Sequence, residues 1–246
     1  MKIYTSIQKG DFHVNYCEDS LVSTKIGENK VLIAVMDGCS MGTESHFAST
    51  LFAKILKKIS QELFYTEFIQ PQDETLEKQL YSILKKLFLE LKSIKNQLNL
   101  ETLELLSTLI LGVYDASTKS VEIICIGDGV VVHNKTITEY EQGDKPDYFA
   151  YHLQEDFHVW YDNFKQKLSL KNVEDLSIMT DGIYTYKQLG NSTNYEEAEI
   201  LIDYLSIDKN TTNHTDMLQG KMMLLEKERS LKPMDDLAII RITNHE

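Results

Sequence analysis

The stretch VLIAVMDGCSMG, residues 31–42, opens with six apolar residues and then turns polar at Asp37 and Gly38. A short apolar run rich in aliphatic side chains is typical of a buried β-strand. Asp-Gly taken alone indicates a hairpin turn, because it is one of the strongest short turn signals. A functional carboxylate at a strand end is an equally good interpretation, so the remainder of the chain has to decide between them.

Carboxylates also stand at the ends of four further apolar runs, VEIICIGDG, LSIMTDG, MDDLAIIRI and CEDSLV. In the order of these runs they are Asp128, Asp181, Asp235 with Asp236, and Glu18 with Asp19. Carboxylates gathered in one place repel each other and raise one another's pKa values unless divalent cations neutralise them. The pattern therefore predicts a cation site, and oxygen-only ligands favour Mg²⁺ or Mn²⁺ over zinc or copper.

Composition restricts the class of protein. The 246 residues are enough for a substantial core, and 42% hydrophobic content with only 3 prolines indicates an ordered chain. A formal net charge of -13 argues against nucleic acid as a partner, because phosphate binding relies on a lysine- and arginine-rich surface. No apolar run reaches the roughly 18 residues of a membrane span, and the start lacks the apolar core of a signal peptide, so we expect a cytoplasmic protein. The 3 cysteines, Cys17, Cys39 and Cys125, lack CxxC spacing, which indicates reduced thiols and argues against structural zinc.

The order of predicted elements indicates an α+β fold in a single domain over residues 1–246. Three or four strands over residues 1–36 precede two amphipathic helices, one with apolar positions from Phe47 to Leu63 and one from Leu80 to Leu98. Strands follow over 103–140, 165–170 and 175–180, then a helix over 216–231 and a last strand. Hairpin spacing predicts antiparallel sheets with the helices outside them. The heptad spacing of the second helix leaves a coiled coil as an alternative.

Residues 141–164, EQGDKPDYFAYHLQEDFHVWYDNF, interrupt this pattern. The segment is rich in aromatic residues without clear periodicity, which predicts a long irregular loop. Loops of that length in a compact domain are often functional. A surface loop packed on the core is the alternative, because most aromatic residues simply contribute to cores.

The order of the motifs ED, DG, ST, GD, TDG and DD, each in its strand context, resembles that of the metal-dependent serine/threonine protein phosphatases of the type 2C (PPM) class. The resemblance implies a four-layer α-β-β-α sandwich of two antiparallel sheets flanked by helices. It also implies two Mn²⁺ or Mg²⁺ ions, with a third in many members, in a cleft at one edge of the sheets. The segment 141–164 would then be a variable flap that shapes substrate choice.

The resemblance assigns the metal ligands position by position. Asp37 matches the aspartate that bridges both ions, and Gly38 matches the glycine whose backbone carbonyl binds one of them. Asp181 and Asp235 match two further ligands. Asp37, Asp181 and Asp235 are therefore the candidate catalytic residues.

Four more carboxylates match positions around the ions. Glu18 and Asp19 match an acidic pair that holds metal-bound water, and Asp128 matches a residue that helps to bind a third ion. Asp236 stands where many members have asparagine, so Asp236→Asn is predicted to leave turnover nearly unchanged.

Some positions depart from the family pattern. Val14 stands where many members have a phosphate-binding arginine, with His13 beside it. Cys39 stands where many eukaryotic members have a histidine that is a candidate general acid. His46 falls on the first predicted helix, where a structural role is favoured over metal binding because the site already has oxygen ligands.

These residues predict hydrolysis of phosphoserine and phosphothreonine in phosphorylated protein substrates by a metal-activated water. A single general acid or base accelerates a reaction only about 10²–10⁴-fold, far less than the acceleration that hydrolysis of a phosphate monoester requires. Two metal ions can activate water and stabilise charge together. The alternative is a non-catalytic, pseudophosphatase-like binding module. The missing arginine favours that alternative, and the retained ligands favour the enzyme.

Overall fold

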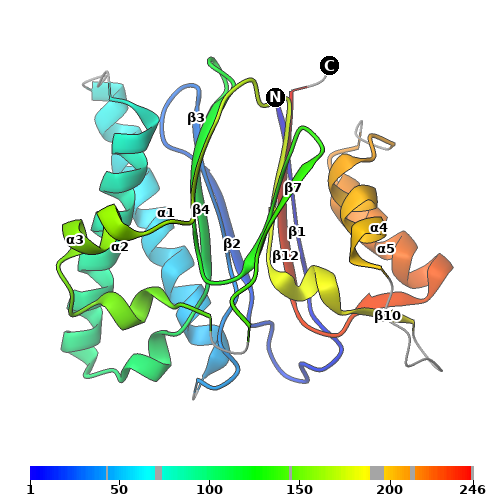
Figure 1. The fold of residues 1–246 in the computed structure, drawn as a ribbon, viewed down its shortest axis with the longest axis horizontal. Helices are drawn as coiled ribbons and strands as arrows, with labels where there is room; N and C mark the ends of the chain where they lie inside the picture. The colour runs from blue at the N-terminus through cyan, green and yellow to red at the C-terminus, as the bar shows by residue number, and fades with distance from the viewer. Residues whose placement is uncertain (43, 70–73, 144–145, 189–196, 211–213, 245–246) are drawn as a thin grey trace.

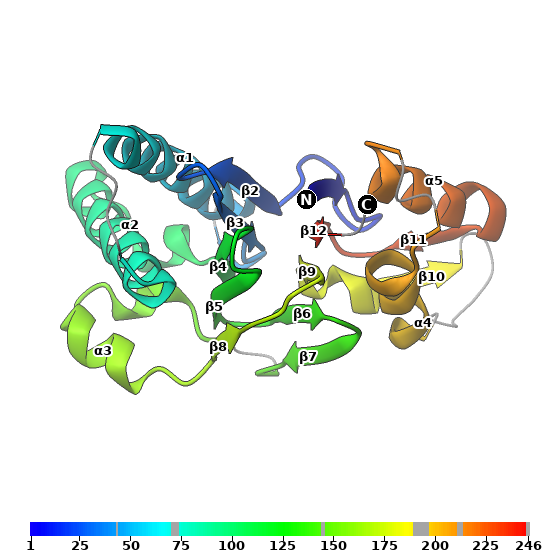
Figure 2. The same cartoon turned by 90° about the horizontal axis from the view of Figure 1, so that it is seen from above.

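The computed structural model describes residues 1–42, 44–69, 74–143, 146–188, 197–210 and 214–244. Two five-stranded antiparallel sheets face each other in the middle of the molecule (Figure 1). Helices α1, α2 and α3 cover the outer face of one sheet, and α4 and α5 cover the outer face of the other (Figures 1 and 2). This arrangement confirms the predicted four-layer α-β-β-α sandwich. No helix within the described residues combines the length and apolar character needed to cross a membrane.

The first sheet has the order β2-β3-β4-β5-β8. Its strands are β2 (Ser20–Lys25), β3 (Lys30–Met36), β4 (Leu109–Asp115), β5 (Ser120–Ile126) and β8 (Lys167–Leu170). The opening stretch forms β3, and alternate residues of this strand face different layers. Ile33 and Val35 lie in the core between the sheets, whereas Leu32 and Ala34 lie in the core beneath the helices. The run is continuously apolar because both faces of the strand are buried.

The second sheet has the order β1-β12-β9-β6-β7. Its strands are β1 (Lys2–Gln8), β12 (Leu237–Thr243), β9 (Asp175–Met179), β6 (Gly129–His133) and β7 (Thr136–Tyr140), and a small extra sheet pairs β10 (Tyr186–Gln188) with β11 (Leu231–Pro233). The chain passes from the first sheet to the second between β5 and β6. Gly127 and Gly129 have φ angles of 86° and 148° at this crossing, a backbone region that favours glycine.

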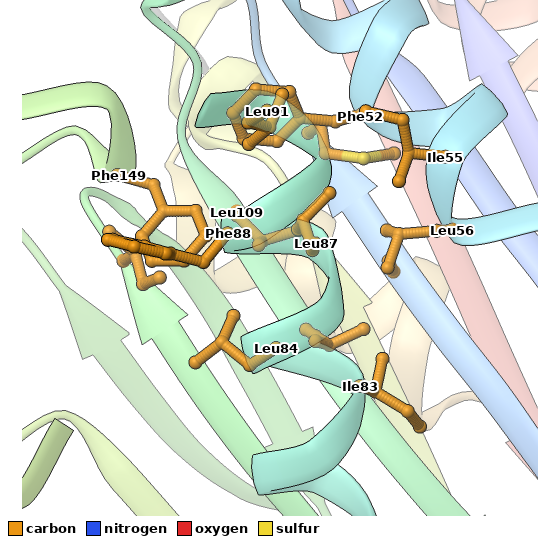
Figure 3. Packing of buried hydrophobic residues seen from close by; sticks show 14 of the residues in the cluster. Phe52, Ile55, Leu56, Ile83, Leu84, Leu87, Phe88, Leu91, Leu109 and Phe149 are labelled. Carbon is orange, nitrogen blue, oxygen red and sulfur yellow. The ribbon is translucent and has the colours of Figure 1, made fainter. Parts of the chain in front are cut away.

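Two long helices, α1 (Ser45–Ile69) and α2 (Leu76–Leu98), confirm the predicted pair, and the short η1 (Thr102–Leu105) leads from them into β4. Helix α2 begins at Thr75, whose side chain accepts a hydrogen bond from the Lys78 N–H, and ends at Asn99 in the left-handed conformation. Its apolar face packs on α1 and on strands β4 and β5, as Figure 3 shows for Leu84, Leu87 and neighbouring residues. The heptad spacing therefore serves helix–sheet packing, and the coiled-coil alternative is wrong.

The prediction of an irregular loop over residues 141–164 is wrong for much of that segment. It contains η2 (Phe149–His152) and α3 (Phe157–Asn163), and α3 begins at Asp156, whose carboxylate accepts hydrogen bonds from two backbone N–H groups. Phe149 and Trp160 are buried, and Phe149 contacts Phe88 of α2 (Figure 3). These aromatic residues pack in the core beneath the helices, so they follow its shape and show no periodicity. Residues 144–145 lie outside the described residues.

The remaining elements lie beyond β9. They are η3 (Asp181–Thr185), α4 (Ala198–Ile202), a π-helical turn (Asp203–Ile207) and α5 (Met217–Arg229), which confirms the helix predicted over 216–231. Arg241 of β12 is fully buried, and its guanidinium makes two hydrogen bonds to the Asp175 carboxylate at 3.0 and 2.7 Å. The same guanidinium donates to the carbonyl oxygens of Leu205 and Asp208, which ties the π-helical turn to the sheet.

Candidate metal centre

Five of the predicted carboxylates are brought to one end of the sandwich by strand register. β2 begins opposite the last residue of β3, so Asp19 and Asp37 are neighbours. β12 begins opposite the end of β9, which brings Asp235 close to Asp181. The crossing from β5 to β6 adds Asp128. In Figure 1 this is the lower end of the two sheets, away from the two chain termini and near the unlabelled yellow helical turn of residues 181–185.

The turn after β3 is built by close backbone contact. The Gly38 N–H donates to the Glu18 carbonyl at 3.2 Å, and the Asp37 N–H donates to Thr108 Oγ1 at 3.1 Å. A Cβ atom on Gly38 would lie 2.1 Å from the Ser45 carbonyl oxygen, so only glycine fits here. The hairpin interpretation of Asp37-Gly38 is wrong, because β3 leads into α1 and its antiparallel partner β4 follows both long helices.

Asp19 joins the two sheets at this end. Thr180 Oγ1 donates to Asp19 Oδ2 at 2.6 Å and accepts a hydrogen bond from the Ala238 N–H at 2.9 Å. Asp19 is 5% exposed, and within the described part of the chain its Oδ1 has no hydrogen-bond partner. A buried carboxylate oxygen without a donor is costly, which makes this atom a candidate to face a cation.

Burial and mutual repulsion raise the pKa values of the central carboxylates. Burial, with repulsion from Asp236 and Asp181, raises the pKa of Asp19 to about 8, although the hydrogen bond from Thr180 opposes the shift. Burial, followed by repulsion from Asp235 and Asp128, raises the pKa of Asp181 to about 6. The pKa of Asp37 lies well above its usual range for the same reasons, burial first and then its neighbours Asp19, Asp181 and Asp235. The carboxylates therefore form one interacting cluster that needs protons or cations.

Asp236 and Asp235 have different surroundings although they are adjacent in the chain. Asp236 is 1% exposed, and its carboxylate accepts hydrogen bonds from the backbone N–H groups of Gly10 and Glu18 and contacts His13 Nδ1 at 2.7 Å. The Asp235 side chain is 46% exposed, and its Oδ1 accepts the Asp236 N–H at 2.8 Å. Asp236 thus anchors the segment before β2, whereas Asp235 faces the open side of the cluster.

Glu18 and Asp128 lie at the margins of the cluster. The Ser45 hydroxyl donates to Glu18 Oε1, and the Ser49 hydroxyl donates to the Glu18 carbonyl oxygen, so the start of α1 holds this residue. Asp128 Oδ1 accepts the Gln142 N–H at 2.7 Å, and burial raises the pKa of Asp128 above its ordinary value. The charge of Asp128 also acts on Asp181, and Glu18 Oε1 lies 4.0 Å from His13 Nε2.

Two polar residues of the site were missed by the sequence interpretation. Thr180 bridges Asp19 and the start of β12, and its signal was its place directly before Asp181 in the TDG motif. His13 contacts Asp235 and Asp236, although it was noted only as the neighbour of Val14. The sequence around His13 holds no comparable signal, because both contacts are to residues more than 220 positions away along the chain.

The donor set fits hard divalent cations. In the chain as described, no three Asp, Glu, His or Cys side chains are arranged as ready ligands of one ion, so an ion would have to draw the carboxylates together. The predicted side-chain ligands are all carboxylates, and the unpartnered Asp19 Oδ1 lies among them. Oxygen ligands of this kind suit Mg²⁺ and Mn²⁺.

A sequence profile of the protein phosphatase 2C family matches residues 11–222 of the chain. This range includes Glu18, Asp19, Asp37, Asp128 and Asp181. It ends before Asp235 and Asp236, whose place in the cluster comes from the strand register and contacts given above. No curated protein matches the chain.

Solved structures of bacterial phosphatases share the fold. A bacterial serine phosphatase carrying one substitution has a TM-score of 0.67 at 16% identity, covering 100% of this chain and 99% of that chain. The phosphatase domain of the cell fate determinant SpoIIE from Bacillus subtilis, with a fragment of its regulatory domain, has a TM-score of 0.56 at 17% identity, covering 98% and 63%. RsbX in complex with magnesium has a TM-score of 0.53 at 13% identity, covering 97% and 94%.

Proposed function

Because the chain belongs to the protein phosphatase 2C family, whose members are metal-dependent protein serine/threonine phosphatases, we propose that the cluster of Asp37, Asp181 and Asp235 is its catalytic centre. The observation that supports this assignment is their convergence. Three carboxylates from distant parts of the chain lie within electrostatic reach of each other at one end of the sandwich, where Asp181 and Asp235 both raise the pKa of Asp37.

Two divalent cations, Mn²⁺ or Mg²⁺, would lower the pKa of a water molecule at this centre and neutralise charge on the phosphoryl oxygens. Asp37 would hold the ions together with Asp181 and Asp235, since the charges of both these residues and of Asp19 act on its carboxylate. The Gly38 carbonyl would complete one coordination sphere. Asp128 would contribute to a third site, because it lies within electrostatic reach of Asp181.

The residues around the ligands keep the carboxylates in place. Thr180 holds Asp19 by a 2.6 Å hydrogen bond, and Ser45 holds Glu18. Held in this way, Glu18 and Asp19 would accept hydrogen bonds from water at the centre. Acceptors fixed in advance cost no reorganisation when charge develops during the reaction.

The proposed substrate is a protein that carries phosphoserine or phosphothreonine. The SpoIIE neighbour is described as a cell fate determinant, which supports a regulatory phosphoprotein as the substrate class. Tyr148 of the segment 141–164 lies within electrostatic reach of Asp37, since its pKa is raised mainly by burial, then by Cys39 and then by Asp37. That proximity supports a role of the segment in substrate choice. Three free cysteines support a reducing, cytoplasmic setting.

Hydrolysis of a phosphopeptide in the presence of Mn²⁺ tests this function directly. We expect release of phosphate that stops on addition of chelator, and a loss of about 100-fold or more in Asp37→Asn, because even residues outside the ligand sphere typically contribute 10- to 100-fold. Asp203→Asn is the matched control and should retain activity, because Asp203 is exposed and lies in the outer helical layer, directly after α4. A folded Asp37→Asn protein that turns over substrate at the parent rate across a Mn²⁺ titration would refute the assignment. A parent protein that binds Mn²⁺ without any hydrolysis would favour the non-catalytic alternative.

A further inference from the structure

The segment between β1 and β2 lies along the backbone that precedes β12. The Asp11 and Phe12 N–H groups donate to the carbonyl oxygens of Pro233 and Met234 at 3.1 and 2.9 Å. A Cβ atom on Gly10 would lie 2.3 Å from the Asp235 carbonyl carbon, so the two backbones are in direct contact. The segment therefore packs directly against the chain that carries Asp235 and Asp236.

His13 is the residue of this segment that enters the cluster. Its Nδ1 lies 2.7 Å from Asp236 Oδ2, and its Nε2 lies 3.4 Å from Asp235 Oδ1 and 4.0 Å from Glu18 Oε1. The His13 side chain is 17% exposed, whereas the adjacent Val14 is 83% exposed. The imidazole thus spans the distance between the buried Asp236 and the more exposed Asp235.

We propose that His13 is a positioning residue of the metal centre, which orients the Asp235 carboxylate through its Nε2 while its Nδ1 is anchored on Asp236. The inference rests on the proposed function, because it takes Asp235 as a metal ligand. Asp235 Oδ1 receives the Asp236 N–H at 2.8 Å and faces His13 Nε2 on the protein side. That arrangement leaves Asp235 Oδ2 as the oxygen for the ion.

Other roles of His13 fit these contacts less well. Both ring nitrogens face carboxylate oxygens, so neither is directed to a metal ion. His13 is also not needed to fix Asp236, because the Gly10 and Glu18 N–H groups bind the Asp236 carboxylate independently of the ring. The contact for which His13 has no substitute is the one between its Nε2 and Asp235 Oδ1.

Two substitutions separate the two ring nitrogens. The amide of His13→Asn can replace Nδ1 toward Asp236 but does not reach Asp235, whereas the amide of His13→Gln can occupy the place of Nε2. We expect the Kd for Mn²⁺, measured by calorimetric titration, to rise about 10-fold or more in His13→Asn and to stay within about three-fold of the parent in His13→Gln. Thermal melts in chelator show whether each variant is folded.

His152→Asn is the matched control, since His152 also lies between two carboxylates, 2.8 Å from Asp147 and 2.7 Å from Glu155, and its removal should leave the Kd unchanged. Parent-like Mn²⁺ affinity in both His13 variants, or an equal loss in both, would overturn the proposal. Should His13→Asn not fold, His13→Ala takes its place, and a loss of about 10-fold in His13→Ala beside a parent-like Kd in His13→Gln supports the proposal, whereas a parent-like Kd in both overturns it. A parent protein that binds no Mn²⁺ would instead refute the proposed metal centre itself.

Discussion

Replacing Asp236 with asparagine exchanges one oxygen of a buried carboxylate for an amide nitrogen. The parent carboxylate accepts the Gly10 N–H at 2.7 Å on one oxygen, and on the other it accepts the Glu18 N–H and contacts His13 Nδ1. With the amide oxygen toward Glu18, the amide nitrogen faces the Gly10 N–H. With the amide reversed, it faces the Glu18 N–H. In either orientation one buried donor loses its acceptor.

The size of the effect follows from these contacts. An unsatisfied buried donor costs about 1–3 kcal/mol, and the hydrogen bonds that remain no longer involve a charged acceptor, which weakens each of them. Asp236 also repels Asp19, so removal of its charge offsets part of this cost. We expect a net loss of about 2–3 kcal/mol in the free energy of unfolding, whereas the nearly neutral effect that the family resemblance predicts concerns turnover.

Urea denaturation at pH 7 in chelator measures this loss, with Asp235→Asn as the matched control. Asp235 is half-exposed, and asparagine keeps an oxygen for the Asp236 N–H, so its free energy of unfolding should change by less than about 1 kcal/mol. For the affinity for Mn²⁺ we expect the opposite order: Asp235→Asn should lose more affinity than Asp236→Asn, because Asp235 is the proposed ligand. An Asp236→Asn protein as stable as the parent in chelator would show that the three contacts do not carry the energy assigned to them.

Three further outcomes are expected. The pKa values of Asp19, about 8, and Asp181, about 6, are raised above the value of about 4 in the unfolded chain. In chelator, the protein is therefore stabilised by these two groups below about pH 4, and this stabilisation is lost as the pH rises through 6 and 8. Because metal binding requires deprotonated carboxylates, the gain in Tm on adding Mn²⁺ should grow from pH 5.5 to pH 8.5, and a gain independent of pH would contradict this. Phe149→Ala should lower the free energy of unfolding by about 3–5 kcal/mol, whereas Tyr151→Ala, at a 48% exposed position two residues away, should change it by about 0.5 kcal/mol or less in the same urea titration. Thr180→Val, which keeps the side-chain shape, should cost about 1–3 kcal/mol by urea denaturation, because the Asp19 carboxylate loses its donor and a β12 N–H loses its acceptor.

The local sequence pattern was sufficient to predict most of the secondary structure, but it failed where the chain passes from one sheet to the other. β5 and β6 are separated by only Gly127 and Asp128, which matches the spacing of a hairpin, yet they belong to different sheets. A short turn and a crossing between sheets have the same sequence signal over so few residues. The helix α3 was missed because its apolar residues contact α2, and such packing has no period of its own along the chain.

The sequence by itself determined the strands, the long helices and the acidic residues at the strand ends, because hydrophobic periodicity and the motif order depend on neighbouring residues. Together with the family resemblance it determined the α-β-β-α sandwich and the candidate ligands Asp37, Asp181 and Asp235. Only the tertiary structure decided the roles of the residues around them. His13 meets Asp236 across 223 positions of the chain, and Thr180 meets Asp19 across 161. Contacts at such separations depend on which strands pair and which sheets face each other, and these are properties of the whole fold.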